Sequence, residues 1–229
     1  MLKVTPILLA IAYALALYWI SARNTRRQLD KQSSVLRDRE LSRLTDRMAN
    51  SLDLPQIKVN IFEVDPVNGL AAPDGRIFIT RGFYRKYKTG EVTAEEMASV
   101  IAHELGHVAL GHSRRRMIDF SGQNAIRVAL ATVLGRFVPF VGVWIANMAV
   151  SLLAARLSRG DEYEADAYAS ALLVKSGIGT EPQKALFRKL EGLTTGGGAA
   201  QAPAWLMSHP KTEERIRAIE KLEQRWIQS

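Results

Sequence analysis

The stretch ASVIAHELGHVALGH, residues 98–112, decides how the rest of the chain is interpreted. It contains three of the chain's four histidines. In a helix, residues four apart lie on one face, so His103 and His107 can both reach a single metal ion. Glu104 lies beside them, where a carboxylate can act on a water that the metal activates. The pattern H-E-x-x-H therefore predicts a metal site with its own base.

Sequence signals at both ends support a helix around this stretch. Thr93 and Glu96 form the T-x-x-E pattern of a capping box, which predicts that the helix begins near Thr93. Gly111 is suited to its end. His112 follows His107 by five residues, about 140° around a helix, so we expect it to have a structural or supporting role. The third protein ligand must come from elsewhere.

The composition restricts the kinds of site that the chain can form. Its 229 residues are enough for one domain with a core, together with an anchor. There is no cysteine, so any transition metal has to be bound by His, Asp or Glu. The formal net charge of +8 suits an anionic membrane surface. No basic motif interleaved with aromatic residues indicates a nucleic-acid partner.

Candidates for the third ligand occur in the segment DEYEAD, residues 161–166. Glu162 and Asp166 are four apart and share a helical face. One carboxylate can bind the metal while the other accepts a hydrogen bond from a ligand histidine, as metal-bound histidines usually require. An acidic, solvated helix start explains Asp161 and Glu164, but it does not explain this paired spacing.

The N-terminus predicts a membrane anchor. Residues 4–20 carry no charge and, with the start of the chain, approach the length of about 20 residues that one bilayer crossing needs. Tyr18 and Trp19 stand at the end of the run, as in an interfacial aromatic belt. A cleaved signal peptide is the competing interpretation, but the basic start is limited to Lys3. We expect residues 1–22 to be retained as a single-pass anchor.

The charges after the anchor indicate its orientation. Because basic residues favour the inner face of a membrane, we expect the catalytic domain to face the cytoplasm from the cell (inner) membrane. The basic residues concerned are Arg23, Arg26, Arg27 and Lys31.

The remaining elements follow from periodicity. Residues 23–54 are typical of one charged amphipathic helix that links the anchor to a domain over residues 55–229. Residues 57–64, IKVNIFEV, alternate as a strand does, and a turn at residues 73–75 leads to a second strand, Arg76–Thr80. We expect these two strands to form a small hairpin. Helices are expected over residues 158–175 and at the C-terminus, where one face carries Ile216, Ile219, Leu222 and Trp226.

A second apolar run, residues 137–155, is long enough to cross a bilayer. The candidate ligands lie on both sides of it in the chain, and they cannot bind one ion from opposite faces of a membrane. A second crossing would bury Asp119 and Arg127, which is costly. We expect residues 124–157 to form an apolar helical hairpin that packs over the active site and touches the membrane surface. Two transmembrane spans are the alternative.

Three segments in this order, SVIAHELGHVALGH, SRGDEYEADAYA and SHPKTEERI, resemble the M48 family of zinc metalloendopeptidases. DGRIFITRG, before the first of them, fits the family's strand, and the resemblance covers roughly residues 55–220. It implies an α+β fold, a mostly helical zincin-like (gluzincin) domain with a small β-sheet, preceded here by the N-terminal transmembrane helix. It also implies one Zn2+ per chain and polypeptide substrates, among them misfolded membrane proteins.

The resemblance further implies roles for individual residues. His103, His107 and Glu162 would bind the zinc, with Asp166 holding a ligand histidine. His209, in SHP, would help to stabilise the oxyanion of the reaction. An extended substrate would pair with the edge segment NGLAA, which consists of Asn68, Gly69, Leu70, Ala71 and Ala72.

Together these observations predict a membrane-anchored, zinc-dependent endopeptidase in membrane-protein quality control. It would hydrolyse peptide bonds by zinc-activated water, with Glu104 as general base. The alternative is a catalytically silent membrane-surface interaction protein that keeps the metalloprotease fold. Such a protein would typically have lost Glu104 or a ligand, and all of them are present. We therefore expect an enzyme.

Overall fold

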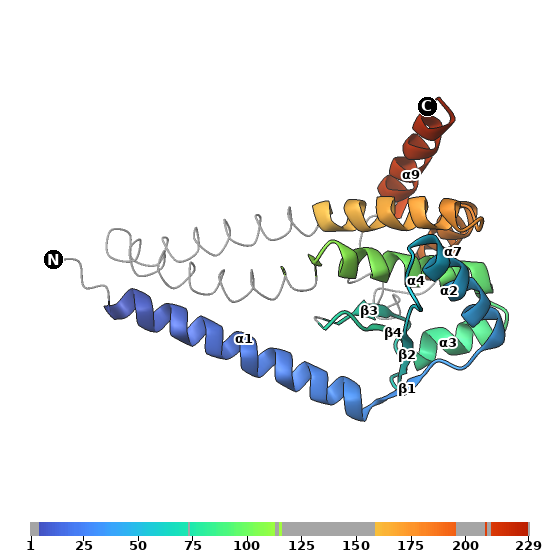
Figure 1. Cartoon of the computed structure of the whole chain (residues 1–229). Helices are drawn as coiled ribbons and strands as arrows, with labels where there is room; N and C mark the ends of the chain where they lie inside the picture. Colours follow the sequence, from blue (N-terminus) through green and yellow to red (C-terminus); the bar gives the residue numbers. More distant parts are fainter. Residues whose placement is uncertain are drawn as a thin grey trace.

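A four-stranded mixed sheet lies between a long N-terminal helix and a group of helices that includes the H-E-x-x-H segment (Figure 1). The computed structural model describes residues 5–72, 74–112, 115, 159–195, 209 and 212–228. Its elements are α1 (Thr5–Lys31), β1 (Ser33–Val35), α2 (Arg39–Ser51), β2 (Val59–Phe62), β3 (Gly69–Ala71), β4 (Ile77–Thr80), α3 (Arg81–Lys88), α4 (Ala94–Ala109), α7 (Glu181–Thr195) and α9 (Thr212–Ile227). A further helix covers residues 159–175. The expected α+β character, mostly helical with a small sheet, is confirmed.

The strands are ordered β1–β2–β4–β3. β2 and β4 pair in parallel, whereas β1 and β3 pair antiparallel with their neighbours. The expected hairpin between the strands at residues 57–64 and 76–80 is therefore wrong, because a tight turn cannot join parallel strands. The predicted turn exists, but it joins β3 to β4. The amide of Ala72 donates to the carbonyl of Arg76 at 2.8 Å, and Gly75 adopts φ +86°, which glycine tolerates best.

α4 is the central helix of the domain. It contacts α2, α7 and both β3 and β4, and every residue from Glu96 to His107 is buried. Its apolar residues, such as Met97 and Ile101, share the main core with Ile79 of β4. Polar side chains on a helix buried on all sides need partners within the protein. Both histidines of H-E-x-x-H have such partners within the protein.

Residues 23–54 do not form the single linker helix that was expected. α1 continues through the first part of this segment, β1 then pairs with β2, and α2 begins after Asp38, whose carboxylate accepts hydrogen bonds from the first turn. The apolar face of α2, formed by Leu41, Leu44 and Met48, is buried in the main core. α2 thus belongs to the domain, which begins before the expected boundary.

α1 lies on the side of the sheet opposite to α4 and extends away from it (Figure 1). Its C-terminal end is attached to the sheet, because Leu29 packs with Phe78 and Asp30 forms an ion pair with Arg76 at 2.7 Å. Among the residues that the structure describes, no helix combines the length and apolar character of a membrane span. The anchor over residues 1–22 stays a prediction.

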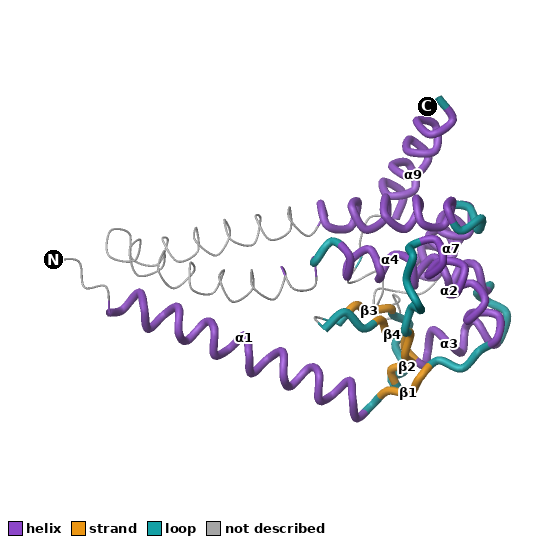
Figure 2. Tube along the Cα trace, in the orientation of Figure 1, coloured by secondary structure: helices purple, strands orange, loops and turns teal. Residues whose placement is uncertain are grey.

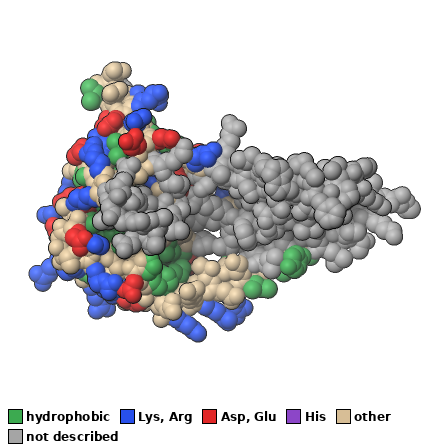
Figure 3. Space-filling view, turned by 180° about the vertical axis from the view of Figure 1, so that it is seen from behind, with side chains coloured by type: hydrophobic (Ala, Val, Ile, Leu, Met, Phe, Trp, Pro, Cys, Tyr) green, Lys and Arg blue, Asp and Glu red, His purple; other side chains and the backbone are tan. Residues whose placement is uncertain are grey.

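The C-terminal half adds a helical layer beside α4 (Figure 2). The helix expected over residues 158–175 is confirmed at 159–175. In α9, two of the four residues expected on one apolar face, Ile216 and Ile219, are buried. α3 and α7 were not expected, and the apolar hairpin over residues 124–157 lies outside the described residues. On the face drawn in Figure 3, basic and acidic side chains are interspersed over the described elements.

Candidate metal centre

The helix that carries H-E-x-x-H begins where the sequence predicts. The hydroxyl of Thr93 accepts a hydrogen bond from the amide of Glu96, and the carboxylate of Glu96 accepts one from the amide of Thr93 at 2.8 Å. Lys189 of α7 adds an ion pair to Glu96, also at 2.8 Å. The complete capping box sets the start of α4, and with it the common face of His103 and His107.

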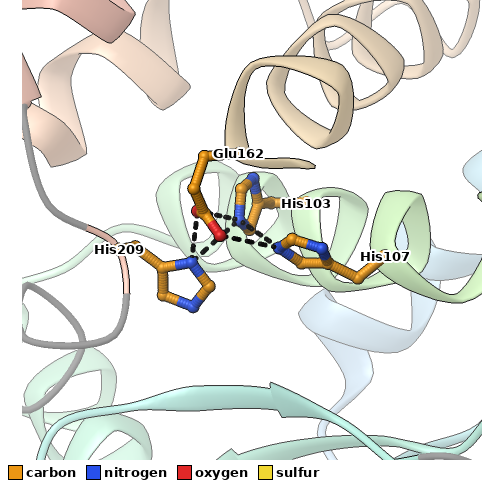
Figure 4. Close-up of side chains that lie close together, drawn as sticks. All are labelled: His103, His107, Glu162 and His209. Atoms are coloured by element: carbon orange, nitrogen blue, oxygen red, sulfur yellow. Dashed lines mark hydrogen bonds and ion pairs between the residues drawn. The ribbon is translucent and has the colours of Figure 1, made fainter. Parts of the chain in front are cut away.

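Three buried donor groups converge between α4 and the helix over residues 159–175 (Figure 4). The Nε2 atoms of His103 and His107 are 3.1 Å apart, and the carboxylate of Glu162 lies 3.4 Å from the first and 3.5 Å from the second. Ligand atoms at about 2.1 Å from a tetrahedral zinc ion are about 3.4 Å from one another. Two imidazoles and one carboxylate are also a donor set of catalytic zinc sites. The three residues therefore fit a zinc ion.

A glycine allows the two ligand-bearing helices to approach each other. A Cβ atom at Gly106 would lie 3.0 Å from the carbonyl oxygen of Ala165 and 3.1 Å from its Cα atom. These distances are shorter than ordinary contacts, so the backbones of the two helices pack directly against each other. This packing brings Glu162, three residues before Ala165, within reach of the histidines on α4.

Asp166, the second member of the carboxylate pair, contacts the ring of His103. Its Oδ1 atom lies 2.9 Å from Nδ1 of His103. An ionised carboxylate only accepts hydrogen bonds, so Nδ1 carries the proton and Nε2 directs its lone pair at the cluster. Burial lowers the pKa of His103, but the carboxylates of Asp166 and Glu162 outweigh burial and raise it to about 9. In the metal-free protein, a proton therefore competes with the metal for this ring.

Two residues that the sequence analysis missed hold Asp166 in place. Arg215 of α9, which is 1% exposed, donates to Asp166 from Nε at 2.5 Å and from Nη2 at 2.7 Å. Gln183 of α7 donates to it at 3.3 Å. Burial works to raise the pKa of Asp166, but Arg215 and His103 hold it below its usual value. A signal for Arg215 was present, since it lies four residues before Ile219 on the apolar face of α9.

His209 reaches the same cluster from the segment before α9 (Figure 4). Its Nδ1 atom lies 2.5 Å from Glu162 and 3.4 Å from Nε2 of His103, while its Nε2 atom lies 3.6 Å from Glu104. The ring thus extends from the metal donors to the candidate base. Burial lowers the pKa of His209 to about 4 although Glu162 acts to raise it. The ring is neutral at pH 7 and carries one N–H.

The expected substrate segment runs beside Glu104. A Cβ atom at Gly69 would lie 3.2 Å from Oε1 of Glu104. Leu70 and Ala72 instead pack on the side of the sheet away from α4, because successive side chains of a strand face opposite sides. Asn68 precedes the strand, and its main-chain N–H and C=O groups are both 3.0 Å from a hydroxyl of β4. The segment therefore presents mainly its backbone and Gly69 to the candidate base.

Comparison with known protein families assigns the chain. Residues 35–223 match peptidase family M48. The chain belongs to this family. The matched range begins at the end of β1 and includes α2 and all the candidate ligands. The protein is therefore an M48 metalloendopeptidase, and the family implies a metal ion, typically zinc.

Named relatives agree with the family assignment. The M48 peptidase is 29% identical to metalloprotease LoiP of Escherichia coli (strain K12) over 181 residues, which cover 79% of this chain and 68% of LoiP. It is 27% identical to the protease HtpX homolog of Salinibacter ruber over 237 residues, covering 90% and 82% of the two chains. It is 21% identical to human mitochondrial metalloendopeptidase OMA1 over 170 residues, covering 72% and 32%.

Proposed function

We propose that this M48 peptidase is a membrane-anchored, zinc-dependent endopeptidase that binds one Zn2+ per chain through His103, His107 and Glu162. The observation that carries the proposal is a group of buried donors next to Glu104. Nε2 of His103 lies 3.1 Å from Nε2 of His107 and 3.4 Å from Oε2 of Glu162, and Nε2 of His107 lies 3.5 Å from Oε1 of Glu162. Zinc, when bound, polarises the scissile carbonyl and makes a water more acidic.

Glu104 acts first as the general base and then as the general acid. It is buried next to His103 in the chain, and its Oε1 atom lies 3.6 Å from Nε2 of His209, but Glu104 is not one of the four side chains placed to hold a metal ion together. It accepts a proton from the water whose oxygen bonds to the carbonyl carbon. When the C–N bond breaks, Glu104 returns this proton to the leaving amine.

His209 donates to the developing oxyanion in this proposal. In support, its Nε2 atom lies 3.6 Å from Glu104, next to the base. A bound zinc would engage the oxygens of Glu162, which would then be weaker acceptors for a proton on Nδ1 of His209. The neutral ring can then carry its proton on Nε2 and donate from there, a contribution of roughly 3 kcal/mol in comparable oxyanion sites.

An extended polypeptide pairs with the segment Asn68–Ala72 in this proposal. In support, β3 stands at the end of the strand order and runs beside Glu104. Main-chain pairing depends little on the sequence of the substrate, because every polypeptide offers the same N–H and C=O groups. Such a site suits unfolded polypeptides of varied sequence.

We also propose that residues 1–22 hold the enzyme in the cell (inner) membrane, with the catalytic domain facing the cytoplasm. The uncharged N-terminal run and the basic residues after it support this placement, and α1 carries the chain from the run to the sheet as one helix. The apolar hairpin over residues 124–157 would add contact with the membrane surface. The substrates would then be misfolded membrane proteins, in a quality-control role.

Metal analysis and proteolysis of the purified protein test the chemistry. We expect one zinc per chain and cleavage of casein. Glu104→Gln should lose cleavage and keep its zinc, because Glu104 is a base and not a ligand. A protein that takes up no zinc would refute the metal centre. Normal cleavage by Glu104→Gln would refute the mechanism.

Fractionation tests the membrane placement. Removal of residues 1–22 should release much of the protein from membranes. Cysteines introduced at positions 115 and 160 should react with an impermeant thiol reagent from the same side, because both flank the ligand cluster. Reaction from opposite sides would rule out Glu162 as a ligand of the same ion.

A further inference from the structure

His112 is a fully buried histidine that the mechanism above does not use. An uninterrupted helix would place it about 140° away from His107. Gly111, with φ +71°, ends α4 in the left-handed conformation and turns the chain back. A Cβ atom at Gly111 would meet nothing within 4 Å. Glycine is therefore favoured here by its positive φ angle and not by a lack of space. The turn brings the rings of His107 and His112 together, with their centroids 5.1 Å apart.

A chain of hydrogen bonds leads from His107 to an acidic pair. The Nδ1 atoms of His107 and His112 are 2.9 Å apart. On the other side of the ring, Nε2 of His112 lies 3.1 Å from Glu164 and 3.7 Å from Asp161. Arg115 lies 3.4 Å from Asp161, which supplies a positive charge to this pair. The group is therefore better suited to orient His112 than to bind a second cation.

The carboxylates determine where the protons lie along this chain. An ionised carboxylate only accepts hydrogen bonds, so His112 donates its Nε2–H. Neutral His112 then has a lone pair on Nδ1, which accepts the Nδ1–H of His107. His107 is left with a lone pair on Nε2, the atom that lies 3.1 Å from Nε2 of His103. A neutral histidine has two tautomers, and this chain selects the one that binds metal through Nε2.

We propose that His112 is a positioning residue for the zinc ion, and that it holds His107 in the tautomer and orientation that bind the metal. The proposal rests on the function above, because it requires His107 to be a ligand. Ligand histidines usually donate to a carboxylate, a backbone carbonyl or water. Here the imidazole of His112 takes that place. The helix over residues 159–175 is then connected to all three ligands. It carries Glu162 itself, it contacts His103 through Asp166, and it contacts His107 through Glu164 and His112.

Two variants at the same position separate hydrogen bonding from packing. His112→Phe fills the space of the ring and offers no acceptor. His112→Asn offers an amide oxygen at about the place of Nδ1, which can accept from His107. We expect His112→Phe to weaken zinc affinity by about tenfold to a hundredfold and His112→Asn to keep it within about threefold. Zinc affinity is measured by competition with a chromogenic chelator, and the visible spectrum of the cobalt-substituted protein reports the ligand geometry.

A second experiment covers the case in which His112→Phe does not fold. The double variant Asp161→Ala/Glu164→Ala removes both acceptors behind the ring and leaves the ring itself. It should weaken zinc affinity several-fold, because His112 is then free to take either tautomer. Unchanged zinc affinity in His112→Phe or in the double variant, or equal losses in His112→Phe and His112→Asn, would overturn the proposal. A wild-type protein that binds no zinc would overturn the metal centre and this inference together.

Discussion

Arg215 and Asp166 form a double hydrogen bond that joins α9 to the group of candidate metal ligands. Its two contacts, Nε to Oδ2 at 2.5 Å and Nη2 to Oδ1 at 2.7 Å, connect α9 with the helix over residues 159–175. Oδ1 of Asp166 also lies 2.9 Å from Nδ1 of His103. The Arg215 guanidinium lies over the ring of Phe187, 4.4 Å from its centroid. Asp166 therefore links α9 to His103, a candidate ligand, through a single carboxylate.

Replacing Arg215 should destabilise the whole domain. Arg215→Met leaves the charge of Asp166 buried without its main partner, which should cost about 3–5 kcal/mol. Arg217→Met is the matched control, because Arg217 lies on the same helix with its side chain 74% exposed. The control should change stability by less than about 1 kcal/mol. Urea unfolding of both variants measures the difference, and equal stability would show that the buried pair does not hold α9.

Adding a methyl group at Gly106 should weaken metal binding. Gly106→Ala places a Cβ atom 3.0 Å from the backbone of Ala165, so the two ligand-bearing helices have to separate. We expect zinc affinity to fall by about tenfold, because ligands must be held to within about 0.5 Å. Gly160→Ala is the control, since a Cβ atom there meets nothing within 4 Å. Unchanged zinc affinity in Gly106→Ala would mean that the helices adjust without moving the ligands.

A methyl group at Gly69 should affect turnover and not metal binding. In Gly69→Ala the new atom would lie 2.8 Å from Cγ1 of Val100, which has to shift, and 3.2 Å from Oε1 of Glu104, so the base is displaced with it. We expect kcat to fall by roughly 10- to 100-fold, since catalysis is sensitive to misplacement of a reacting group by about 1 Å. Zinc content should stay the same, because Glu104 is not a ligand. Loss of zinc from this variant would contradict the separation of the two roles.

The metal-free protein should be most stable near pH 6.5. The pKa of His103 is raised from 6.5 to about 9, so its contribution is present below pH 6.5 and is lost as the pH rises toward 9. The pKa of His209 is lowered to about 4, so its contribution is present above pH 6.5 and is lost as the pH falls toward 4. Urea unfolding in the presence of a chelator, from pH 4 to 9.5, tests both limbs. In His103→Gln the fall in the free energy of unfolding between pH 6.5 and 9 should be absent. A fall as steep as in the wild type would contradict the assignment.

The helix that carries H-E-x-x-H could be predicted from the sequence because its signals are local. The capping box of Thr93 and Glu96 spans one turn, and so does the pair His103 and His107. Such patterns depend on helix geometry alone and need no knowledge of the rest of the fold. The same reasoning predicted that His112 is not a ligand, but it did not include the turn at Gly111 that brings this ring back to His107.

The partners of this helix depend on tertiary contacts. Spacing showed that Glu162 and Asp166 share a face, but only the structure shows that Glu162 meets the Nε2 atoms and that Asp166 meets Nδ1 of His103. Arg215 is 49 residues from Asp166, and periodicity shows only that it lies on a buried face. The parallel pairing of β2 with β4 could not be predicted for the same reason. Strand order depends on non-local contacts, which the alternation of residues along a strand does not reveal.

The buried charges of the metal cluster also define the valence of the ion that it accepts. With Glu104 ionised, as the proposed general base has to be, Glu104, Glu162 and Asp166 contribute three negative charges and Arg215 contributes one positive charge, and none of these four residues is more than 3% exposed. Two positive charges are missing, and one divalent cation supplies them. A monovalent ion would leave an uncompensated anion in the protein interior, which is costly. Electroneutrality therefore couples the site to the solvent: the empty centre has to take up protons in place of the ion, and loading it has to release them.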